Sequence, residues 1–298
     1  MKKIVIIFLA MVTITGLQSC QSTKSATSSR MLKFNFEKGK GYDYEMIINM
    51  DQEVMNQKMQ MDMTTYYSMD VVADDGNTKT LTTTYDRFKM NMTVMGMNVE
   101  VDTDHPLQEL GEGKKDPMKM LNGLLGAIKG RKFTMKVNQE GRIESVEGFK
   151  DMAESIVDSM HLDEAQRQQM VQQFSKQFND KNIKDQFERV LYIFPNKEVK
   201  VGDSWQKVTN PGAPMAGKYT STYTVTDIEG DMVTLEEKSK IESDSETVKL
   251  SGDITGTLVV DSKSGLVVSA DQDMDITTAT GGQSIKMIGK TKIKGKVR

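Results

Sequence analysis

Hydrophobic and polar side chains alternate along most of this chain, which is the pattern of β-strands with one buried and one wet face. Alternate residues from Tyr42 to Met50 are apolar, and most of the residues between them are polar or charged. The turn sequence Asp-Asp-Gly-Asn at 74–77 separates the second such segment from a third. The pattern therefore predicts long antiparallel strands within these ranges: 42–50, 59–71, 78–92, 248–260, 266–276 and 285–297.

The middle of the chain changes to helical spacing. Apolar residues recur three or four positions apart from Met118 to Ile128, and again in three stretches between residues 149 and 191. A short hairpin around Glu140-Gly141 is expected between them. We expect the apolar stripes of these helices to cover the sheet rather than to bind a ligand.

Together these patterns predict an α+β fold. It consists of a large, curved, mostly antiparallel, half-barrel-like sheet, with several helices from the middle of the chain packed on one side. Residues 31–298 are expected to form a single domain. Two β-rich halves, 31–147 and 195–298, would then be joined by helices in residues 149–191.

Two short segments hint at duplication of the sheet. Lys38-Gly39-Lys40-Gly41-Tyr42 and Val201-Gly202-Asp203-Ser204-Trp205 each place a glycine and an aromatic residue at the start of a strand. Elsewhere, Gly252 and Gly256 interrupt the apolar face of one predicted strand. Glycines there indicate bending or the close approach of another element.

The first residues have the pattern of an export signal. A cationic start is followed by an apolar run, Ile4 to Gly16, which is shorter than the roughly 20 residues of a membrane span. Cys20 stands directly after this signal and resembles the lipidated acceptor of a bacterial lipoprotein. We therefore expect a signal peptide over residues 1–19 and a flexible tether over 20–30 that begins at lipidated Cys20. The alternative is a secreted protein whose cysteine lies beside the cleavage site.

The expected location is the cell envelope. A lipoprotein with no acidic residue among the first positions after Cys20 resembles those of the outer membrane, on its periplasmic face, and its lipid anchor makes the membrane a partner. Cys20 is the only cysteine, so the domain contains no disulfide. A net charge of −3 and a pI of about 5.6 argue against nucleic acid as a partner.

Methionine is unusually frequent, with 24 residues. Three interpretations stay open: an ordinary packed core, an adaptable groove for a lipid or hydrophobic peptide, and a soft-metal site for Cu(I). Copper sites usually include His or Cys, and neither is close in sequence, so neither a metal nor a cofactor is expected. The candidate apolar ligand face comprises Tyr42, Tyr44, Met46, Ile48, Met59, Met61, Met63 and Tyr67.

No catalytic set is evident in the sequence. His105 and His161 have no partner at the spacing of a metal site or a triad. Gly202-Asp203-Ser204 is similar to the nucleophile block of one esterase class, but no histidine follows His161 to serve as a downstream base. A hydrolase with paired carboxylates would need two acids that converge in a pocket.

The charges near the C-terminus follow the strand pattern. Asp271, Asp273 and Asp275 occupy the wet face of one strand, and we expect them to pair across a turn with lysines between 286 and 292. Lys294, Lys296 and Arg298 have no obvious carboxylate opposite them in this hairpin. Any contact with anionic lipid is therefore expected to start at these three residues.

Two longer motifs carry a family resemblance. They are Phe34-Asn35-Phe36-Glu37-Lys38-Gly39 leading into Tyr42-Asp43-Tyr44, and Phe194-Pro195 followed by Val199 to Trp205. Together with the cysteine signal, they resemble a family of uncharacterised Bacteroidetes lipoproteins, which implies no activity and no catalytic residues. The architecture is similar to the half-barrels of periplasmic lipoprotein carriers.

The leading functional hypothesis is a non-catalytic outer-membrane lipoprotein that binds a lipid-like ligand or an envelope partner on its apolar face. A structural or protein-interaction lipoprotein with a fully packed core is the alternative. Met-based Cu(I) binding and a hydrolase activity rank below these two hypotheses.

Overall fold

The structure, a computed structural model, describes residues 29–54, 57–94, 97–105, 123, 125–159, 163–177, 179–211, 217–244, 248–280 and 283–298. The predicted signal peptide and Cys20 lie outside these residues, as do His161 and most of the helix predicted from the apolar spacing between Met118 and Ile128. Residues 125–128 of that helix are described and are helical.

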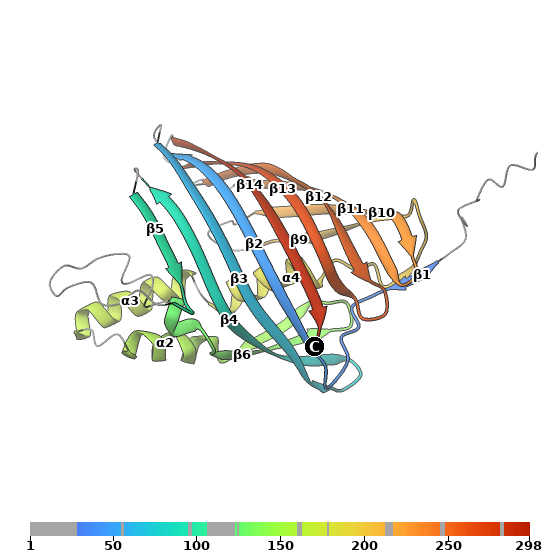
Figure 1. Cartoon of the computed structure of the whole chain (residues 1–298), viewed down its shortest axis with the longest axis horizontal. Helices are drawn as coiled ribbons and strands as arrows, with labels where there is room; N and C mark the ends of the chain where they lie inside the picture. Colours follow the sequence, from blue (N-terminus) through green and yellow to red (C-terminus); the bar gives the residue numbers. More distant parts are fainter. Residues whose placement is uncertain are drawn as a thin grey trace, which may run out of the picture.

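One large antiparallel sheet of 12 strands dominates the molecule, and it is not closed (Figure 1). Its strands follow one another across the sheet in this order: β7 (Ile143–Glu147), β6 (Lys132–Asn138), β4 (Thr78–Val94), β3 (Gln57–Asp74), β2 (Gly41–Val54), β14 (Gln283–Val297), β13 (Leu266–Thr280), β12 (Val248–Asp261), β11 (Met232–Asp244), β10 (Lys218–Glu229) and β9 (Ser204–Thr209). Strand β5 (Met97–Asp102) pairs with β4 beyond the end of β6. A separate two-stranded sheet joins β1 (Arg30–Leu32) to β8 (Lys197–Val199).

Three helices lie between the two β-rich regions, as the periodicity predicts: α2 (Phe149–Ser159), α3 (Glu164–Gln177) and α4 (Asp180–Leu191). Figure 1 shows the sheet curving around α4, with α2 and α3 near β5, β4 and β6. Helix α4 buries Ile183, Phe187 and Leu191, and Phe187 packs edge-on against Tyr67 of β3. The α+β class and the predominance of antiparallel sheet are confirmed.

The two faces of the sheet differ as the alternation predicts. Leu250 is buried on the concave side, whereas Asp62, Asp253 and Asp271 are exposed on the convex side. Met46, Met61 and Val268 are partly buried on the concave side. The concave face therefore holds the core.

The convex charges pair across neighbouring strands. Carboxylate and ammonium lie 3.4 Å apart in Asp271–Lys292, 3.1 Å in Asp273–Lys290 and 3.0 Å in Asp275–Lys286, which confirms the predicted pairing. Each such exposed pair contributes less than about 1 kcal/mol.

The expectation that the last three basic residues lack carboxylates is wrong. Lys294 lies 2.9 Å from Glu45, Lys296 lies 3.7 Å from Asp43, and Arg298 pairs with Asp43 and Asp70. The reason is that β14 pairs with β2 as well as with β13, so β2, some 250 residues earlier, supplies Glu45 and Asp43, and Asp70 comes from the next strand, β3.

Helix α4 and the residues after it connect the two edges of the open sheet. The Glu188 carboxylate accepts a hydrogen bond from the backbone N–H of Ile143 on β7, at 2.9 Å. On the other edge, the indole N–H of Trp205 on β9 donates to the carbonyl of Ile193, at 2.7 Å. The Tyr192 ring lies 3.9 Å from the guanidinium of Arg142 and 3.9 Å from the ammonium of Lys207. The two edge strands are therefore fastened to one segment.

The hint of duplication has a structural counterpart. Gly39, before β2, and Gly202, before β9, both have positive φ, and each donates its N–H to a carbonyl on the strand that follows in sequence, Val71 of β3 and Val225 of β10, both at 2.8 Å. A bulge follows directly after Val71 in β3 and after Val225 in β10. Strands β2–β3–β4 and β9–β10–β11 therefore form two equivalent units.

The contact between α4 and the β6–β7 turn can be tested at a glycine. A Cβ on Gly141 would lie 2.1 Å from the carbonyl oxygen of Leu191, whereas Gly76, also at positive φ, has nothing within 4 Å. Gly76→Ala should cost about 1–2 kcal/mol of unfolding free energy from backbone conformation alone. Gly141→Ala should cost about 2–5 kcal/mol because overpacking adds to the same conformational term. Denaturant unfolding measures both, and equal losses would contradict the close approach of α4.

Candidate functional site

A cavity of about 170 Å³ lies between α4 and the concave face of the sheet. One side is apolar, with Met46 and Ile48 of β2, Ile293 of β14, and Ile254 and Leu258 of β12. Most of the polar and charged groups come from β9 to β11 and α4, and Gln272 of β13 and Thr291 of β14 lie among the apolar strands. The cavity is therefore amphipathic and runs across the strands rather than along them.

A buried carboxylate stands at the centre of the polar side. Glu237 of β11 accepts a hydrogen bond from Gln272 at 2.5 Å, and its other oxygen lies 2.6 Å from the Ser239 hydroxyl. Ser239 in turn lies 2.6 Å from the Ser221 hydroxyl. Gln272 belongs to β13, so it reaches Glu237 across Gly256 of the intervening strand. A Cβ at that glycine would lie 2.8 Å from Gln272 Cγ, so the missing side chain is what allows the contact.

Two cations face the same cavity. The Arg189 guanidinium of α4 lies 5.2 Å from the ring centre of Tyr219, and Lys207 of β9 covers the Tyr192 ring. Burial lowers the pKa of Lys207. Burial also raises the pKa of Tyr223, and the nearby Glu237 charge adds to that rise, so the phenol stays neutral.

The duplication explains why the cavity lies where it does. In the first unit the cross-strand row is Tyr44–Tyr67–Tyr85, and at the equivalent positions the second unit has Lys207–Ser221–Ser239. One row further, Thr83 corresponds to Glu237, and the neighbouring strand has Phe133 against Gly256. The space in the second unit therefore arises where Ser221, Ser239 and Gly256 stand in place of Tyr67, Tyr85 and Phe133.

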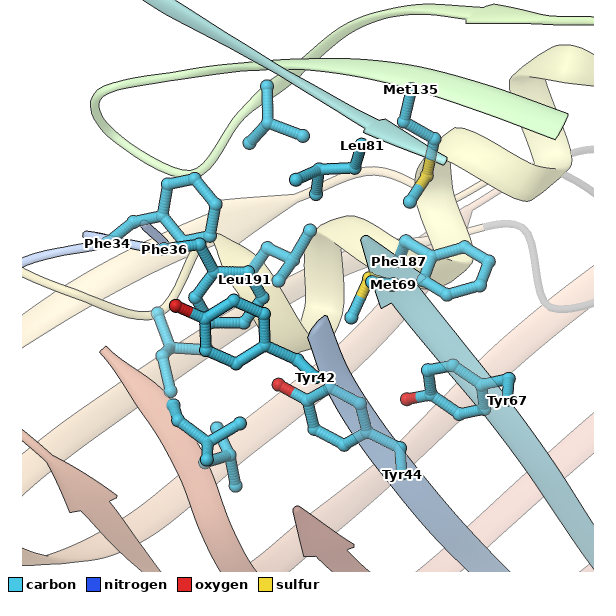
Figure 2. Packing of buried hydrophobic residues seen from close by; sticks show 14 of the residues in the cluster. Phe34, Phe36, Tyr42, Tyr44, Tyr67, Met69, Leu81, Met135, Phe187 and Leu191 are labelled. Carbon is cyan, nitrogen blue, oxygen red and sulfur yellow. The ribbon is translucent and has the colours of Figure 1, made fainter. Parts of the chain in front are cut away.

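The predicted ligand face is divided by the structure. Tyr42, Tyr44 and Tyr67 are 1–3% exposed and belong to the packed core (Figure 2). Tyr42 stacks on Phe36, and Tyr44 stacks on Tyr67, with ring centres 3.7 and 5.1 Å apart. Placing these three tyrosines on an open ligand face is therefore corrected, because α4 and the residues after β1 cover them.

Of the remaining residues of that face, Met46 and Ile48 line the cavity. Met59, Met61 and Met63 are partly buried on β3 and are not among the residues that line it. Met61 stands opposite Met50 and Met92, and Met63 stands opposite Met90 and the cavity residue Ile48. Within the described part of the chain, no group of three His, Cys, Asp or Glu side chains could hold a metal ion.

Alternation alone did not single out the polar side of the cavity. Glu237 shares its strand face with Leu235 and Ile241, so a charged residue in an apolar series was the available signal. Gln272 has the same parity as Ala270 and Met274 and gave the same kind of signal. Arg189 gave no such signal in the sequence, because local spacing does not encode the position of α4 over the sheet.

The other candidates stand apart from the cavity. His105 is exposed in a turn after β5. Gly202 and Asp203 form the turn before β9, and Ser204, which begins that strand, is exposed, so a turn accounts for this triplet. None of the helices within the described residues has the length and apolar character that membrane crossing requires.

Comparison with protein families gives one result. The model described as a family of unknown function, DUF6263, matches residues 75–267. The chain belongs to this family. The matched region includes α4 and Glu237, whereas β2, β14 and Gln272 lie outside it. The expectation of an uncharacterised family is thus confirmed, and no match was found among curated proteins.

Solved structures show only distant likeness. Lipovitellin, from a study of its lipid–protein interactions, is 8% identical, with a TM-score of 0.48 over 89% of this chain and 26% of that one. The translocator domain of the autotransporter NalP from Neisseria meningitidis is 7% identical, with a TM-score of 0.25 over 87% and 88% of the two chains. The β domain of the Bordetella autotransporter BrkA is 6% identical, with a TM-score of 0.33 over 85% and 98%. The chain spans about a quarter of the length of lipovitellin.

Replacing tyrosine with phenylalanine should have different effects on stability at Tyr42 and at Tyr44. The buried Tyr44 hydroxyl has no hydrogen-bond partner among the described residues, whereas the Tyr42 hydroxyl accepts from the Glu37 N–H at 2.8 Å. Tyr42→Phe should therefore lower the unfolding free energy by about 0.5–1.5 kcal/mol. Tyr44→Phe should leave it unchanged or raise it by up to about 1 kcal/mol. Denaturant titration of both variants checks this, and a clear loss at Tyr44 would show that its hydroxyl is satisfied.

Proposed function

We propose that this protein is a non-catalytic binding protein that holds an amphipathic, lipid-like ligand in the cavity between α4 and the sheet. The observation that carries the proposal is the amphipathic lining. Met46, Ile48 and Ile293 face a buried polar cluster centred on Glu237 across the same space. A cavity with an apolar wall and a few convergent polar groups is typical of small-molecule sites.

The size of the cavity limits what it can hold. Ligand pockets usually measure about 300–1,000 Å³, whereas an apolar cavity of about 150 Å³ is known to accept benzene. A volume of about 170 Å³ therefore suits a headgroup with the first part of a chain, rather than a whole lipid. The rest of the chain would lie against the partly buried methionines of β3, and methionine adapts readily to irregular apolar ligands.

The remaining features of the proposal concern the cell envelope. We propose that the signal peptide is removed, that Cys20 is lipidated, and that this lipid anchors the domain to the periplasmic face of the outer membrane. The carrier-like, half-barrel description of the sheet belongs to the same proposal. An open sheet whose concave side is only partly covered by α4 supports it.

A structural or protein-interaction lipoprotein is the second candidate. It is favoured by the tightly packed aromatic cluster around Tyr67 and Phe187 and by the fully paired charges along β13 and β14. Both carboxylates that line the cavity, Glu188 and Glu237, accept hydrogen bonds from protein donors, and this arrangement favours positioning over acid–base chemistry.

Filling the cavity separates the two candidates. Ser221→Tyr introduces the side chain that the first unit carries at the equivalent position, Tyr67, and should abolish binding of a fluorescent apolar probe. Ser251→Tyr, the same change at an exposed convex position of β12, is the matched control and should bind as the parent does. Equilibrium fluorescence titration and native mass spectrometry for copurified lipid measure the outcome. Equal binding by both variants would place the ligand elsewhere, and no binding by the parent would favour the structural candidate.

The anchor is tested at its only possible attachment point. Cys20→Ser should abolish incorporation of radiolabelled palmitate and release the protein from the membrane fraction, because serine cannot form the thioether. Ser19→Ala, one residue before it, should retain label. Label that persists in Cys20→Ser would contradict the anchor.

A further inference from the structure

The charges around the cavity are unevenly satisfied. Neither Arg189 nor Lys207 has a carboxylate within 4.0 Å in the described part of the chain; each instead faces an aromatic ring. The acids that share the cavity are engaged by the protein, Glu188 by the Ile143 N–H and Glu237 by Gln272 and Ser239. The cations therefore have donors left for a ligand, whereas the acids have used acceptor positions internally.

The two cations lie on the same side of the cavity. Lys207 stands opposite Ser221 in the β9–β10 pairing, and Tyr219, over which Arg189 lies, stands opposite Thr209. Lys207 and Tyr219 are thus diagonal neighbours on the concave face, with backbone positions roughly 7–8 Å apart. A compact anionic group can reach both cations from a position above Ser221.

The apolar wall lies across from them. Ile48 of β2 leads along a cross-strand row to Met63 of β3 and Met90 of β4. The two cations, Lys207 of β9 and Arg189 of α4, therefore lie near β9 and β10, whereas this row across β2 to β4 is apolar. A ligand that spans the concave face needs a charged end and an apolar chain.

We propose that the cavity selects a single-chain amphiphile with an anionic headgroup, a carboxylate or a phosphate. The headgroup lies between Arg189 and Lys207, and the chain runs over Ile48 toward Met63. This inference rests on the proposed ligand-binding function and adds the chemical class of the ligand. Arginine suits such a role because its planar donors match carboxylate and phosphate oxygens.

The test uses the full chain, delipidated and kept in solution with an amphipathic polymer. Two probes differ only in charge: dansyl-undecanoic acid and its neutral methyl ester. Fluorescence titration should give the acid roughly tenfold or more tighter binding than the ester, from charge-assisted hydrogen bonds. Dodecanoate and dodecyl phosphate, added as competitors, identify which anionic group displaces the probe better.

Variants assign the effect to residues. Arg189→Gln together with Lys207→Gln should weaken the acid roughly tenfold and leave the ester unchanged, whereas Arg189→Lys should retain most of the affinity. Lys240→Gln together with Lys249→Gln, at exposed positions of β11 and β12, removes the same charge and should change neither probe. Arg189→Gln alone changes an exposed helix position and keeps the Lys207 contact with Tyr192. It should therefore fold as the parent does, and thermal unfolding checks this.

The outcomes are distinguishable. The proposed anionic headgroup would be contradicted if the acid and the ester bound equally, or if the Arg189 and Lys207 variants did not lower the affinity for the acid. The proposed ligand-binding function would still hold in either case. If the parent chain bound neither probe, the proposed function itself would fail.

Discussion

An open sheet leaves backbone donors and acceptors unpaired at its edges, and in this structure the segment from Glu188 to Ile193 contacts both edge strands. Glu188 accepts a hydrogen bond from the backbone N–H of Ile143 on β7, and the Ile193 carbonyl accepts one from the indole N–H of Trp205 on β9. Tyr192 lies between a cation from each edge region. Because the same segment holds both edges, it limits how far the sheet can open. The width of the concave side, and therefore of the cavity, follows from these contacts.

The two equivalent strand units differ in how tightly they pack under α4. In the first, a row of three tyrosines packs against Phe187 and Phe133, so α4 rests on a solid aromatic surface. In the second, the equivalent row is Lys207–Ser221–Ser239, which leaves space under the same helix. The helix can stay in place over a cavity because the first unit supports it.

Much of the fold follows from the sequence because strand alternation and turn signals are local. The Asp271–Lys292 and Asp273–Lys290 pairs were predictable, since both partners belong to one hairpin. The Lys294–Glu45 pair was not, since it depends on β14 pairing with β2, a contact between the two ends of the chain. The same limit applies to the site: spacing marked Met46 and Ile48 as apolar, but only tertiary packing decides that Tyr44 is covered while they line a cavity.

The buried polar cluster bears most directly on the choice between a binding protein and a packed structural domain. Removing a carboxylate from water costs several kcal/mol unless its hydrogen bonds are restored, and apolar residues of similar volume often serve stability equally well. The first unit places no charge at the equivalent position, where Thr83 stands in place of Glu237. A sheet that needed only a core has no use for Glu237, Gln272 and a glycine that lets them meet. A site that must orient a polar ligand under a helix has a use for all three.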